Sequence, residues 1–154
     1  MSPSTPNFDE LIPELKEWND GKGISIDTWL EVYGNFQLTI AYRQLFWPDF
    51  VEHDNCVLVA PFSSKTYEDF FRHTNGDRAA VEAVMNHHHI LDLFSESKQT
   101  ATEAQMRYIG RTLQEIWTAK LKRDFPHRMF AVSFNDIPGL DLVDYQITFS
   151  QRAS

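Results

Sequence analysis

The sequence predicts an α+β fold, in which about five helices pack against one small, mostly antiparallel sheet. Three observations predict it: a long apolar segment in residues 27–60, a long amphipathic helical pattern after residue 100, and two segments of alternating residues near the C-terminus. The length of 154 residues fits one domain spanning 1–154, and the 42% of hydrophobic residues is ordinary for a globular protein. We therefore expect one folded domain rather than a disordered chain.

The most apolar part of the chain, residues 27–60, begins with a segment in which helix and strand patterns compete. Its length of about twenty residues favours a helix, because strands are usually five or six residues long. Asp27 would cap this helix and Pro48 would stop it, although Gly34 and Asn35 weaken it and could mark a break. A helix that is apolar on nearly every face needs burial, so we expect it at the centre of the core.

The other helices are predicted from apolar residues at helical spacing and from caps. A polar lead, residues 1–7, comes first, and we expect it to be frayed. The longest helix begins with Thr100 and Glu103, which match a capping box, and ends before Pro126. The remaining helices are expected over residues 8–18, after a cap at Ser63 or Ser64 and ending before Asn75, and over 78–94.

Three strands are predicted near residues 56–60, 129–134 and 143–150. The first is an unbroken apolar run, which is typical of a strand covered on both faces. The last two alternate apolar and polar residues, and Pro138 with Gly139 between them suits a type II turn. We expect these two strands to pair antiparallel and the first strand to join the same sheet.

Charge and composition limit the classes of function. With 22 acidic and 14 basic residues the net charge is −8, which argues against nucleic-acid binding and favours a basic protein partner. The single cysteine, Cys56, excludes an intrachain disulfide, and no secretory signal or membrane span is visible, so we expect a cytoplasmic protein that does not bind membranes. No cofactor motif is present, so we expect no cofactor; the sequence does not set the oligomeric state.

The strongest candidate for a functional loop lies between the apolar helix and the first strand. Trp47, Glu52, His53 and Asp54 combine a ring, two carboxylates and an imidazole, which could perform acid–base chemistry or bind a cation. The alternative is a solvated turn that covers the core.

The six histidines offer two further candidates. His88 and Asp92 are four residues apart on the predicted helix 78–94 and could supply two metal ligands, with His53 or Asp54 as a third. His87 lies on the apolar stripe of that helix, where it is a core histidine or, together with Tyr33, Tyr42 and Trp47, part of a ligand pocket.

Three functions are therefore open. The first is a noncatalytic protein-binding module with an acidic surface, similar in behaviour to an inhibitor or immunity protein. The second is a small metal-dependent or acid–base enzyme that uses the His and carboxylate residues. The third is a small-ligand-binding domain with an aromatic pocket.

Overall fold

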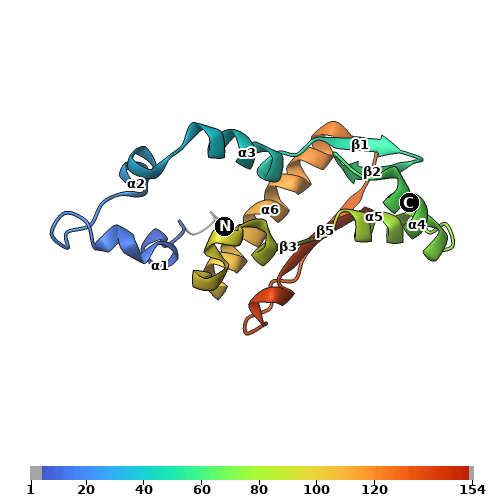
Figure 1. Cartoon of the computed structure of the whole chain (residues 1–154). Coiled ribbons are helices and arrows are strands. Elements are labelled where there is room, and N and C mark those ends of the chain that lie inside the picture. The colour runs from blue at the N-terminus through green and yellow to red at the C-terminus, as the bar shows by residue number, and fades with distance from the viewer. Residues whose placement is uncertain (1–4, 153–154) are drawn as a thin grey trace. The chain divides into compact units, whose positions relative to one another are not determined.

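The protein has an α+β fold, as the sequence predicts (Figure 1). The structure is a computed structural model that describes residues 5–152. Contacts between Cα atoms group the chain into two compact units, residues 1–42 and 43–154, so one domain over 1–154 stays a prediction. Of the predicted frayed lead, residues 1–4 lie outside the described residues, and residues 5–7 have no regular structure.

The N-terminal unit is helical, but the single helix predicted from residue 27 to Pro48 is wrong. Two helices replace it, because Gly34 and Asn35 interrupt the run and Asn35 accepts a hydrogen bond from the backbone N–H of Leu38, capping a new helix. Ser25, rather than Asp27, caps the first of the two. The elements are α1 (Phe8–Leu11), a 3-10 turn (Pro13–Lys16), α2 (Ile26–Tyr33) and α3 (Phe36–Phe46), whose last four residues belong to the second unit.

The second unit contains every described strand. Its helices are α4 (Ser64–His73), α5 (Arg78–Met85) and α6 (Glu103–Asp124), with 3-10 segments at Ile90–Leu93, Ser95–Thr100 and Leu142–Asp144. Its strands are β1 (Phe50–His53), β2 (Cys56–Val59), β3 (His88–His89), β4 (Phe130–Phe134) and β5 (Gln146–Gln151).

The strands form two antiparallel sheets instead of the one that the sequence predicts. In the larger sheet β5 lies between β3 and β4, and β4 and β5 pair antiparallel as predicted, with Phe134 opposite Ile147. In the smaller sheet β2 pairs only with β1, through a turn at Asp54 and Asn55 in which both residues have positive φ. The separation arises because side chains of α5 occupy the other edge of β2.

Glu82 of α5 and Asn86, the residue directly after α5, join the two sheets. The Glu82 carboxylate accepts hydrogen bonds from the backbone N–H of Val57 at 2.7 Å and of Gln151 at 2.6 Å. Asn86 accepts from the N–H of Val59 at 2.9 Å and donates to the carbonyl of Val57. Both side chains are fully buried, so they satisfy strand groups that a neighbouring strand would otherwise pair.

The main core lies where α6 packs on the larger sheet (Figure 1). Trp117 is 1% exposed and contacts the ring of Phe149, so this residue of α6 lies in the core. Gly110 lets α6 approach the sheet closely, because a Cβ atom there would lie 2.2 Å from the ring of Phe134. A second cluster contains Cys56 and Leu58, whereas Val57 faces the main core, so β2 is covered on both faces as predicted.

Two helix boundaries differ from prediction. The capping box of α6 is formed by Thr102 and Gln105, two residues after the predicted pair. The predicted helix 78–94 ends at Met85, because Asn86 turns the chain and uses its side chain on the strands, and the histidines that follow form β3.

Candidate functional site

The predicted functional loop is a β-hairpin whose polar side chains are used within the fold. Glu52 forms an ion pair with Arg128 at 2.6 Å. Asp54 accepts a hydrogen bond from the hydroxyl of Tyr67 at 3.0 Å, and the ring of His53 contacts the ring of Tyr67 at 4.6 Å between centroids. Between this hairpin and His87 or His88 the described residues show no hydrogen bond or ring contact.

Trp47 lies beside a buried cation rather than beside the hairpin carboxylates. The Lys120 ammonium is over its ring at 5.3 Å from the centroid, and also over the ring of Phe50 at 5.4 Å. Lys120 is 5% exposed and forms an ion pair with Asp124. These contacts satisfy the ammonium and fasten the chain before β1 onto α6.

The premise for the metal pair is wrong, since His88 and Asp92 do not share a helix. His88 is in β3, whereas Asp92 lies in the following 3-10 segment and pairs with Lys98 at 2.6 Å. The Lys98 hydrogen bond and charge lower the pKa of Asp92 below its usual value. Within residues 5–152 no group of three His, Cys, Asp or Glu residues is placed to hold a metal ion.

The residues of the predicted aromatic pocket lie in both units. The ring of Tyr33 contacts those of Trp18 and Trp29, at 5.9 and 4.3 Å between centroids. Tyr42 is the last residue of the same unit. His87 belongs to the second unit, where its Nε2 atom contacts the Oε1 atom of Gln146 at 2.5 Å, so a pocket shared by these residues stays a prediction.

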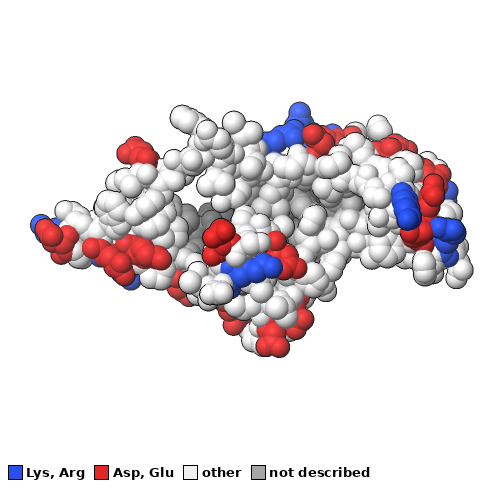
Figure 2. All heavy atoms as spheres, viewed as in Figure 1, with Lys and Arg blue, Asp and Glu red and all other residues white. Residues whose placement is uncertain are grey.

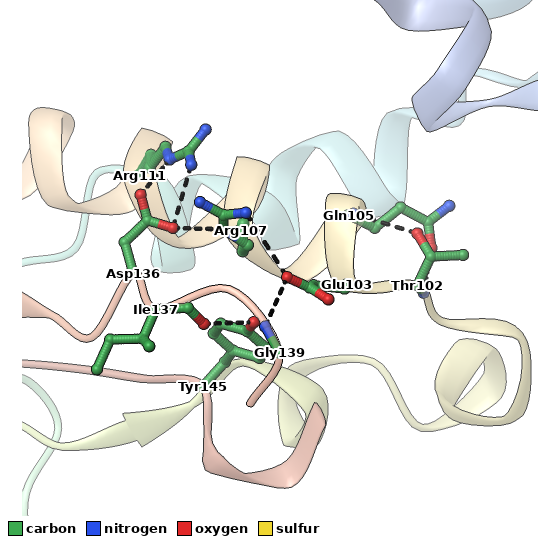
Figure 3. Close-up of polar contacts among 9 residues, drawn as sticks. All are labelled: Thr102, Glu103, Gln105, Arg107, Arg111, Asp136, Ile137, Gly139 and Tyr145. Atoms are coloured by element: carbon green, nitrogen blue, oxygen red, sulfur yellow. Dashed lines mark hydrogen bonds and ion pairs between the residues drawn. The ribbon is translucent and has the colours of Figure 1, made fainter. Parts of the chain in front are cut away.

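A charged network that the sequence did not predict fixes the loop before β5 to α6 (Figure 3). Arg107 and Arg111 both donate to the Asp136 carboxylate, at 2.6 and 2.5 Å. The hydrogen bonds, that of Arg111 above all, hold the pKa of Asp136 below its usual value. Glu103 of α6 accepts a hydrogen bond from the backbone N–H of Gly139 at 3.0 Å. The charged side chains of the network therefore hold the loop against α6 and bond to groups of the protein itself.

A further feature of the part of the chain that the structure describes is the exposed apolar segment of residues 30–44. Every one of these fifteen residues is exposed in the structure, although the sequence predicts this segment as the centre of the core. Its large apolar side chains and their exposed fractions are Leu30 64%, Val32 51%, Tyr33 56%, Phe36 88%, Leu38 53%, Ile40 74% and Tyr42 41%. Within the N-terminal unit taken by itself, this segment is not buried, so the predicted central helix is not part of a core there.

The apolar side chains of α3 lie on opposite sides of the helix. Phe36 and Ile40 are four residues apart and share one face. Leu38 and Tyr42 share another, about 200° away at 100° per residue. A helix of this kind needs cover on more than one side, and its eleven residues are too few for a stable isolated helix, which needs about 12–15.

Charges surround the apolar segment but do not enter its centre. Residues 32–42 contain no charged side chain. Residues 1–42 contain seven acidic residues and two basic ones, a net charge of −5 out of the total of −8. Figure 2 shows acidic side chains over α1, the loop that follows it and α2. In the sequence, α3 has no charged residue before Arg43. The segment thus has an uncharged centre that follows an acidic part of the chain and ends at a basic residue.

Comparison with known proteins adds no relative: no family model, no curated protein and no solved structure matches the chain. Within residues 5–152, no helix combines the length and apolar character needed to cross a bilayer. Function must therefore be argued from the surface and the contacts described above.

Proposed function

We propose that this protein is a noncatalytic protein-binding module, and that a basic protein partner covers the apolar segment of residues 30–44. The exposure of that whole segment is the observation that carries the proposal. Monomeric soluble proteins rarely expose large contiguous apolar surfaces, and those that do use them to bind.

The size of the exposed surface fits a specific interface. Taking roughly 150–200 Å² for each large apolar residue, the seven exposed side chains present roughly 600–850 Å². A stable protein interface buries about 800 Å² on each partner. A partner that covered the segment on more than one side of α3 could therefore bury enough apolar area for such an interface.

The charge of the N-terminal unit supports a basic partner. Its excess of five negative charges lies in residues 1–31, before the uncharged stretch at 32–42, which fits an interface with an apolar core and a polar part beside it. A second copy of this chain would bring the same negative charges together, which opposes pairing of two N-terminal units. Complementary charge on a basic partner instead accelerates association.

The enzyme alternative has less support, because its candidate groups are engaged in the fold. Glu52 is paired with Arg128 and Asp54 with Tyr67, and His53 packs against rings. The cytoplasm remains the expected location.

The test compares the wild type with a Phe36→Ser, Ile40→Ser double variant. Both are offered to an extract of the source cell, and captured proteins are identified and checked for hydrogen exchange at residues 30–44. We expect the wild type to capture a basic protein that slows hydrogen exchange at residues 30–44 and that dissociates when salt is added. The double variant should not capture this protein. A Met129→Ser, Val143→Ser variant is the matched control, since these exposed apolar residues lie in the second unit.

Two results would overturn the proposal. Light scattering could find a dimer that the double variant abolishes, which would assign the segment to self-association. Hydrogen exchange could find residues 30–44 already protected in the isolated monomer, which would mean that the chain covers its own apolar segment.

A further inference from the structure

A small pocket in the second unit is lined by residues of 59–88, none of which belongs to the segment 30–44 used above for partner binding. It has a volume of about 280 Å³, just below the lower end of the range for ligand pockets, about 300 Å³. Side chains of Phe62, Phe70, Val84 and Met85 form its apolar wall. These come from the segment after β2, from α4 and from α5, so several elements shape the pocket.

Few polar residues line the pocket, and none of them is a Lys, Arg, Asp or Glu. Ser63 and Thr66 are exposed residues of the lining at the start of α4, and His88 of β3 is half-buried. A pocket without charge favours an uncharged ligand, because a bound ion would have to give up its water without a partner.

His88 differs from the histidines on either side of it. His87 uses a ring nitrogen on Gln146, and His89 uses Nδ1 on the carbonyl of Val143 at 2.8 Å. His88 packs its ring edge-to-face with Trp117 at 5.7 Å, and neither of its ring nitrogens has a hydrogen bond to any residue that the structure describes. Burial, aided by the charge of His87, lowers the pKa of His88 below 6.5. A neutral imidazole both donates and accepts a hydrogen bond.

The hydroxyl of Ser63 provides a second polar group near the same pocket. Its oxygen accepts a hydrogen bond from the backbone N–H of Thr66 at 3.2 Å, as the cap of α4. The hydroxyl proton is not used by that bond, so it is available to a ligand.

We propose that this pocket binds a small uncharged aromatic alcohol, with its ring between Phe62 and Phe70 and its hydroxyl hydrogen-bonded to His88. The aromatic side chains favour edge or offset ring contacts. A hydroxyl matches the imidazole because each group can donate and accept. The volume admits one substituted ring and excludes a nucleotide-sized cofactor.

The experiment titrates the ¹⁵N-labelled protein with 4-ethylphenol and, as the matched probe without a hydroxyl, with ethylbenzene. Chemical-shift changes in the wild type should map to the lining residues. A His88→Phe variant keeps a ring against Trp117 but removes the hydrogen bond, and one neutral hydrogen bond corresponds to roughly a 3- to 10-fold change in affinity. We expect His88→Phe to bind 4-ethylphenol more weakly than the wild type by that factor. Its affinity for ethylbenzene should change by less than twofold.

Two further variants keep the test decisive. Val84→Trp fills the pocket from a position that is 39% exposed, so it should abolish binding of both probes without unfolding the protein. His127→Phe changes an exposed histidine outside the pocket and should bind as the wild type does. The proposal fails if the lining signals do not shift at millimolar 4-ethylphenol, if His88→Phe binds it as tightly as the wild type, or if Val84→Trp still binds it.

Discussion

Replacing Glu82 with alanine tests whether α5 holds the two sheets together. The Glu82 carboxylate accepts three hydrogen bonds: from the backbone N–H groups of Val57 and Gln151, and from the Gln151 side chain at 2.6 Å. The Gln151 side chain is half-buried and can turn to water, but the two backbone donors cannot leave their strands.

The expected loss of stability follows from those two donors. A buried donor left without a partner costs about 1–3 kcal/mol, so two of them cost about 2–6 kcal/mol. Removing a buried charge also removes its desolvation cost, which offsets part of the loss. We therefore expect Glu82→Ala to lower the free energy of unfolding by about 2–4 kcal/mol, a large share of the total of about 5–15 kcal/mol for a domain.

Urea unfolding measures this loss when it is followed by both circular dichroism and tryptophan fluorescence, because coincident midpoints justify a two-state free energy. Glu115 on α6 is an exposed glutamate, so Glu115→Ala is the matched control and should change stability by less than about 0.5 kcal/mol. The loss of stability in Glu82→Gln should lie between those of Glu82→Ala and Glu115→Ala. The amide oxygen of glutamine can still accept one backbone hydrogen bond, but its NH₂ group faces the other backbone donor. The reasoning is refuted if Glu82→Ala lies within 1 kcal/mol of the wild type.

Two other substitutions test the packing and the charged network of the second unit. Gly110→Ala should lower the free energy of unfolding in urea by about 1–3 kcal/mol, because its methyl group would overlap the Phe134 ring. Ala119→Gly, at an exposed position of α6, is the control, and an equal loss of stability in the two variants would contradict the close approach of α6 to the sheet. Asp136 has a lowered pKa when folded, so its stabilising contribution is present above its ordinary value of 3.8 and is lost as the pH falls below it. Asp136→Asn should therefore lower the melting temperature at pH 7 and flatten its fall between pH 4 and 2, and an unchanged acid profile would count against the network.

The sequence by itself determined the elements whose pattern repeats locally. Alternation placed Phe134, Ile147 and Phe149 on the core face of β4 and β5, because a shift by one residue would expose them all. The helical spacing of α6 likewise put Trp117 in the core. These patterns report burial directly, since each element has one apolar and one polar face.

The tertiary structure decided where polar residues are buried and where apolar ones are not. Glu82 and Asn86 are buried because backbone groups of β2 lie within hydrogen-bonding reach of them. The helix ends there, and the histidines predicted to be helical form β3 instead. Residues 30–44 looked like core, since apolar character indicates a need for cover but not which molecule supplies it. Local pattern therefore predicted the elements, whereas their partners depended on contacts between residues far apart in the chain.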